Sequence, residues 1–172
     1  MDRERMATVI VGLGNPLLRD DGVGNRVAEI LKKRLTHHPL IDVLELSAGG
    51  LRLMEALVGY DRAIIIDAMC TGRYRAGTVR MLGADDLAMA LHATSTHDTS
   101  LARALASGIH LGFVLPRQID FWGIEARECY TFGEIMSPEV ARAVPMAVAA
   151  VLEDLGGEIW TADCGIAAAG PV

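Results

Sequence analysis

The sequence predicts an α/β fold built on a mixed, mostly parallel β-sheet of about five strands. Short aliphatic runs, each a candidate strand, alternate along the chain with segments whose apolar residues recur at helical spacing. The composition agrees with this class, because 51% of the residues are hydrophobic and only 5% are aromatic. Such a profile suits helices with small side chains packed on a buried sheet.

The first half of the chain alternates strand and helix. Residues 8–13 form an apolar run ended by glycine, and residues 22–35 carry apolar side chains on one helical face. Residues 42–46 predict a second strand, 51–58 a short helix and 62–68 a third, fully apolar strand. Strands joined through helices are expected to run parallel.

The second half adds an antiparallel strand. Residues 77–82 follow the preceding strand with no helix between them, so we expect an antiparallel partner and a mixed sheet. Leu101, Leu105 and Ile109 are spaced by four and predict a helix. Residues 118–124 are the fifth strand candidate.

The last helix has the clearest start signal in the chain. Ser137 is the predicted N-cap, Pro138 takes the first helical position and Glu139 lies beside the positive end of the helix dipole. We expect this helix to end at Gly156. Pro145 lies inside this helix and lacks a backbone donor, so we expect a kink or a break there.

Length and charge limit the classes of function. The 172 residues predict one domain spanning 1–172, with 158–172 as a flexible tail. The net charge of −6 disfavours nucleic acid as a partner, and no apolar run reaches the ~20 residues of a membrane helix. Three widely spaced cysteines predict neither a disulfide framework nor a zinc site, and we expect a cytoplasmic protein. They are Cys70, Cys129 and Cys164.

The loop after the first strand carries two adjacent aspartates. The segment 12–24 reads GLGNPLLRDDGVG, and Leu17 stands where a dinucleotide fingerprint needs its third glycine, so we expect no nucleotide cofactor. Asp20 and Asp21 precede the first helix, at the edge where open α/β sheets bind ligands. One aspartate would suffice as a helix cap, which leaves the other for a site.

Two further residues extend this candidate site. Asp67 ends an apolar strand, where an unpaired buried carboxylate would be costly, although hydrogen bonds from the next turn would also explain it. His97 lies in a hydroxyl-rich loop, where a solvated histidine is the common alternative. If Asp21, Asp67 and His97 converge, they offer two carboxylates and an imidazole to a divalent metal such as nickel, zinc or iron.

These segments together resemble the nickel-iron hydrogenase maturation endopeptidases. The resemblance rests on residues 12–24, on IIIDA at 64–68, on STHDTSL at 95–101 and on MSPEV at 136–140, in the family's order. It implies a three-layer fold with helices on both faces of the sheet. It also implies an aspartyl-type endopeptidase that removes the C-terminal extension of the nickel-iron hydrogenase large-subunit precursor after nickel insertion.

The resemblance also implies roles for individual residues. Asp21, Asp67 and His97 would bind nickel that the precursor's own cysteines already hold, so the substrate would supply the metal. The metal would then polarise the scissile carbonyl or activate water. Asp20 is the candidate for a general base.

Two other functions remain open from the sequence. The GLGNP segment also begins peptidyl-tRNA hydrolases, although the acidic charge argues against tRNA binding. A non-catalytic scaffold that checks for nickel in the immature subunit would use the same three ligands.

Overall fold

A computed structural model describes residues 7–83 and 99–156, and within them the chain forms a five-stranded sheet in the order β2-β1-β3-β5-β4. The strands β1, β2, β3 and β5 pair in parallel, and β4 runs antiparallel to β5, which confirms the mixed sheet. The strands are β1 (Thr8–Leu13), β2 (Ile41–Leu46), β3 (Arg62–Met69), β4 (Val79–Met81) and β5 (Gln118–Glu125).

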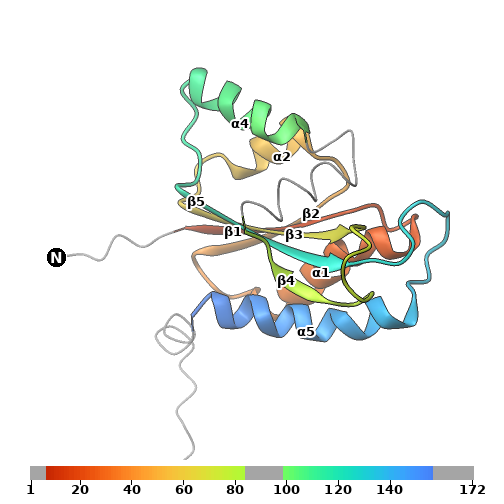
Figure 1. The fold of residues 1–172 in the computed structure, drawn as a ribbon. Coiled ribbons are helices and arrows are strands. Elements are labelled where there is room, and N and C mark those ends of the chain that lie inside the picture. Colours follow the sequence, from red (N-terminus) through yellow and green to blue (C-terminus); the bar gives the residue numbers. More distant parts are fainter. Residues whose placement is uncertain (1–6, 84–98, 157–172) are drawn as a thin grey trace, which may run out of the picture.

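Helices cover both faces of this sheet. In Figure 1, α2 and α4 lie on one face and α1 and α5 on the other, so the expected three layers are confirmed. A 3₁₀ turn, η1, precedes α1. The bounds are η1 (Arg19–Gly22), α1 (Val23–Leu35), α2 (Gly50–Leu57), α4 (Thr99–His110) and α5 (Pro138–Asp154).

The core has two halves that share the strands. Along β1, Ile10 packs toward α1 and α5, whereas Val9 and Val11 pack toward α2. This alternation follows from the two-residue period of a strand, and covering both faces explains why β1 is buried throughout. The edge strand β2 instead exposes Asp42 and Glu45.

Pro145 does not divide the last helix. The helix α5 runs as one element from Pro138 to Asp154 with Pro145 inside it, so of the two expected outcomes, a kink or a break, the break is wrong. Its buried face, which includes Val144, Ala147 and Val148, packs in the core cluster shared with α1. Tertiary packing on both sides of the proline holds the helix together despite the missing donor.

The topology brings several loops to one edge of the sheet. Because β1, β3 and β5 are adjacent and parallel, the segments that follow them emerge side by side. Among residues 7–83 and 99–156, no helix combines the length and hydropathy needed to cross a lipid bilayer. The predicted tail at 158–172 lies outside the described residues.

Candidate active site

Glycines allow the loop after β1 to fold tightly against the strand ends. Gly14 has a φ of 137°, which an L side chain rarely adopts, and a Cβ there would overlap the carbonyl of Asp21. A Cβ on Gly24 would overlap the carbonyls of Leu13 and Ile66. The start of α1 therefore packs backbone to backbone on β1 and β3, which places η1 and its aspartates at the carboxyl edge.

Asp21, in the η1 turn that follows β1, and Asp67, near the end of the neighbouring strand β3, both lie at this edge. Asp21 is partly buried, and its Oδ2 accepts the backbone N–H of Asn15 at 2.7 Å. Asp67 is also partly buried, near the end of β3, and its Oδ1 accepts the backbone N–H of Ala68 at 2.8 Å. Since η1 contacts β3, both carboxylates belong to the same edge, and one oxygen of each is oriented by a backbone donor.

The third predicted ligand, His97, falls outside the described residues. Within the described part of the chain, no group of three or more histidine, cysteine, aspartate or glutamate side chains is arranged to hold a metal ion. The set of Asp21, Asp67 and His97 therefore stays a prediction.

Asp20 is fully buried and joins two loops. Its Oδ2 accepts the backbone N–H groups of Arg127 at 3.0 Å and Glu128 at 2.9 Å. Its Oδ1 accepts the backbone N–H of Ser137 at 2.6 Å, and the Ser137 hydroxyl also donates to Oδ2. The carboxylate thus ties the η1 turn to the loop after β5 and to the start of α5.

This arrangement differs from the capping roles expected for these residues. The N-cap of α1 is Gly22 and lacks a side-chain capping bond, because the η1 turn separates the aspartates from the helix. Ser137 is the N-cap residue of α5, but its hydroxyl donates to Asp20 instead of capping. Burial raises the pKa of Asp20, yet the hydrogen bonds from Ser137, Arg127 and Glu128 outweigh it and leave that pKa below the ordinary 3.8.

Glu125 is a second buried carboxylate, and the sequence reasoning missed it. It is 2% exposed at the end of β5 and accepts the backbone N–H groups of Thr71 and Gly72 at 2.9 and 2.7 Å. The Thr71 hydroxyl donates to it at 2.7 Å. Glu125 therefore holds the turn after β3. A charged residue at the end of a strand was the signal in the sequence that could have identified it.

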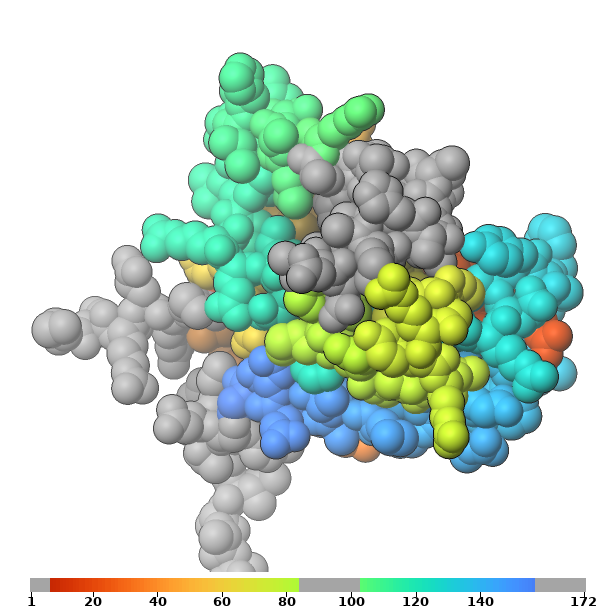
Figure 2. All heavy atoms as spheres, viewed as in Figure 1, coloured from red at the N-terminus to blue at the C-terminus, as the bar shows by residue number. Residues whose placement is uncertain are grey.

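Two cysteines meet beside these loops. The Sγ atoms of Cys70, directly after β3, and Cys129, in the loop after β5, are 2.7 Å apart. Cys129 is 5% exposed and Cys70 is partly exposed. The hydrogen bond with Cys70 and burial raise the pKa of Cys129, and the negative charges of Asp21 and Asp20 add to this rise. Figure 2 shows the segment after β3 (yellow) at the surface beside the loop after β5 (cyan).

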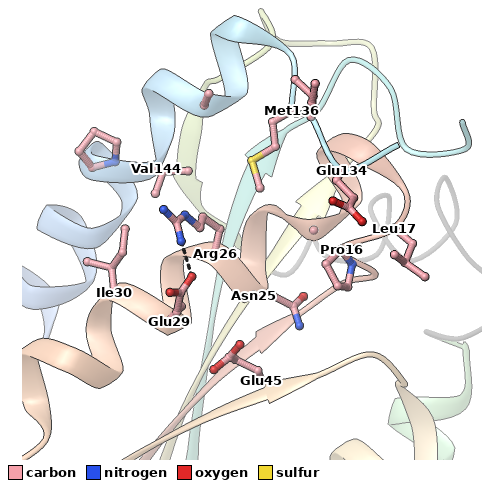
Figure 3. Close-up of a pocket in the computed structure, with 14 residues that line it drawn as sticks. Pro16, Leu17, Asn25, Arg26, Glu29, Ile30, Glu45, Glu134, Met136 and Val144 are labelled. Atoms are coloured by element: carbon pink, nitrogen blue, oxygen red, sulfur yellow. Dashed lines mark hydrogen bonds and ion pairs between the residues drawn. The ribbon is translucent and has the colours of Figure 1, made fainter. Parts of the chain in front are cut away.

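An apolar rim and a groove border the same loops. Leu17, Tyr130, Phe132 and Ile135 are exposed, the last two by 82% and 80% of their surface. Between the loop after β1, α1 and α5 lies a groove of about 810 Å³, whose wall includes Pro16, Leu17, Asn25, Glu134 and Met136 (Figure 3). Exposed apolar side chains grouped on a surface are typical of sites that bind a protein, a membrane or a ligand.

Comparisons with known proteins agree with this architecture. The model of the hydrogenase maturation protease family matches residues 25–154, a range that begins just after Asp21 and includes Asp67 and His97. The hydrogenase 2 maturation protease of Escherichia coli K12 is 27% identical over 120 residues, which cover 69% of this chain and 73% of that protein. A putative hydrogenase maturation protease of Methanocaldococcus jannaschii is 28% identical over 153 residues, covering 86% of this chain and 95% of that protein.

Solved structures give the same result. The hydrogenase maturating endopeptidase HybD of E. coli superposes with a TM-score of 0.76 and 24% identity, covering 89% of this chain and 94% of that one. The [NiFe] hydrogenase maturation protease HybD of Thermococcus kodakarensis superposes with a TM-score of 0.64 and 28% identity, covering 87% of this chain and 99% of that one. The GLGNP segment shared with peptidyl-tRNA hydrolases is only five residues long, whereas the family match covers well over half of the chain. This chain belongs to the hydrogenase maturation protease family.

Proposed function

We propose that this protein is the endopeptidase that removes the C-terminal extension of a nickel-iron hydrogenase large-subunit precursor after nickel insertion. One observation carries the proposal. A chain of the hydrogenase maturation protease family places two partly exposed carboxylates, Asp21 and Asp67, at the carboxyl edge of adjacent strands. Ligands of open α/β sheets bind at that edge.

The substrate's nickel is the feature that these carboxylates would recognise. Asp21 and Asp67, joined by His97, supply oxygen and imidazole ligands, a donor set that suits borderline divalent metals. The backbone N–H groups of Asn15 and Ala68 fix one oxygen of each carboxylate, which sets the direction of the ligands before the precursor arrives. A bound divalent metal can polarise a scissile carbonyl or lower the pKa of water, which is the chemistry such a site would use.

Asp20 takes a positioning role in this proposal instead of the base role that the sequence suggested. A base must reach the proton it removes, whereas the Asp20 carboxylate is fully buried and already accepts four hydrogen bonds. Its lowered pKa also makes it a weak proton acceptor. Asp20 instead holds the loop after β5 next to Asp21.

The exposed rim would contact the precursor. Leu17 lies on the loop that carries Asp21, while Phe132 and Ile135 lie on the loop that Asp20 holds. The backbone joins these two loops, since Gly133 N–H donates to the Leu17 carbonyl at 2.9 Å. A precursor docked on this rim would therefore meet the two carboxylates directly.

The test is proteolysis of nickel-loaded precursor, followed by mass spectrometry of the released C-terminal peptide. We expect cleavage by the wild type, and loss of cleavage in Asp67→Asn and Asp21→Asn while the complex with the precursor still forms. His97→Ala should behave in the same way. Matched controls are Asp42→Asn on the edge strand and His110→Ala at the end of α4, both exposed and expected to cleave normally.

Two results would contradict the proposal in different ways. Binding of the precursor without any cleavage by the wild type would indicate the non-catalytic scaffold. Normal cleavage by the Asp21, Asp67 and His97 variants would show that the site lies elsewhere.

A further inference from the structure

Sheet topology, not sequence proximity, brings Cys70 and Cys129 together. They are 59 positions apart, yet each follows one of two neighbouring parallel strands, and Met69 and Glu125 form the last pair in register. The two Sγ atoms are 2.7 Å apart, already close to bonding distance. A disulfide between these residues would therefore need little movement of the backbone.

The two thiols differ in access and in proton affinity. Cys70 is partly exposed, and its hydrogen bond with Cys129 lowers the pKa of the Cys70 thiol despite burial and the nearby carboxylates. The same hydrogen bond, followed by burial, raises the pKa of Cys129. Because the thiolate is the nucleophile, Cys70 is suited to attack an external disulfide, and buried Cys129 is placed to resolve the product.

We propose that Cys70 and Cys129 form a reversible disulfide by exchange with a low-molecular-weight disulfide such as oxidised glutathione. In the first step, the Cys70 thiolate attacks one glutathione sulfur, forms a mixed disulfide and releases one glutathione thiolate. In the second step, Cys129 gives its proton to solvent, and its sulfur attacks Cys70 Sγ. The bond from Cys70 to glutathione breaks, so a second glutathione leaves, and the protein has lost two hydrogens.

The bridge would join the two segments that frame the candidate site. On one side, Glu125 holds the N–H groups of Thr71 and Gly72. On the other, Asp20 holds those of Arg127 and Glu128. A covalent link between these turns would limit their local opening away from the sheet. The amides of these four residues should therefore exchange more slowly with solvent in the oxidised protein.

The experiment measures whether Cys70 and Cys129 are reduced or oxidised in the full chain. The background protein carries Cys164→Ser, so that Cys70 and Cys129 are its two remaining cysteines. The protein is equilibrated in mixtures of oxidised and reduced glutathione and quenched with acid. The remaining free thiols are then alkylated, and the mass of the protein is measured by mass spectrometry. We expect loss of two hydrogens, one digestion product that links Cys70 to Cys129, and full reversal by dithiothreitol. Adding Cys129→Ser should leave one glutathione on Cys70, whereas adding Cys70→Ser should leave buried Cys129 unmodified.

The proposal is overturned if both thiols of the background protein alkylate fully even in excess oxidised glutathione. It is also overturned if glutathione stays bound to Cys70 in that protein, because Cys129 would then have failed to displace the glutathione and form the disulfide. The background protein alone decides both outcomes, so a poorly folded double variant does not affect the test. None of these readouts depends on peptidase activity, so the inference stands or falls separately from the proposed function.

Discussion

Replacing Asp20 with alanine should separate the loop after β5 from the rest of the site. The variant removes the acceptor of three backbone N–H groups and one hydroxyl, contributed by Arg127, Glu128 and Ser137. Hydrogen bonds to a charged group contribute about 1.5–3 kcal/mol each, and water entering the cavity compensates part of the loss. We therefore expect the free energy of unfolding to fall by about 3–5 kcal/mol.

Urea denaturation measures this change, with Asp42→Asn as the control. The Asp42 carboxylate is exposed and accepts one hydrogen bond, from Tyr60 at 2.7 Å, so that variant should lose about 1 kcal/mol or less. Hydrogen exchange locates the effect, because the amides of Arg127, Glu128 and Ser137 should lose protection in Asp20→Ala. A loss below about 1 kcal/mol with unchanged protection at these amides would show that Asp20 does not hold this loop.

The Asp20 contribution should also depend on pH, with a defined sign. Its pKa in the folded protein is below the ordinary 3.8, so its stabilisation is fully present above that ordinary value. As the pH falls through the lower folded pKa, the carboxylate gains a proton and the contribution is lost. The stability difference between wild type and Asp20→Asn should therefore shrink in this acid range and stay constant near neutrality.

Three further predictions concern other parts of the molecule. Gly24→Ala should destabilise the fold strongly in urea, because its Cβ would overlap two strand carbonyls, whereas Gly83→Ala meets no atom within 4 Å and should be tolerated. The hydrogen bond to Asp42, with burial, raises the pKa of Tyr60 to about 12, so Asp42→Asn should lower it in an absorbance titration, and an unchanged value would contradict this. Phe132→Ser should raise KM for the precursor with little change in kcat, since this exposed ring would contact substrate without touching the reacting atoms.

The fold could be predicted closely because local patterns determine it. The strand at 8–13 was placed with its observed bounds, and the antiparallel β4 followed from the missing helix before it. Asp67 could be proposed as a site residue because a charge at the end of an apolar strand is a local signal. The pattern around Pro145 predicted a kink or a break without deciding between them, since the packing that keeps α5 continuous is tertiary and leaves no local trace.

The roles of Asp20, Glu125 and the cysteine pair could not be predicted in this way. The donors that surround Asp20 lie more than 100 residues later in the chain, and those that bind Glu125 lie more than 50 residues earlier. Cys70 and Cys129 show no spacing motif because strand pairing brings them together. A one-dimensional pattern shows that a carboxylate ends a strand, but not which distant amides it will bind.

Crystallography of this protein soaked with a nickel salt, with anomalous scattering to locate the metal, tests directly whether Asp21, Asp67 and His97 bind nickel. We expect one nickel peak bound jointly by the carboxylates of Asp21 and Asp67 and the imidazole of His97. A peak at other residues, with these three side chains not bound to metal, would contradict it.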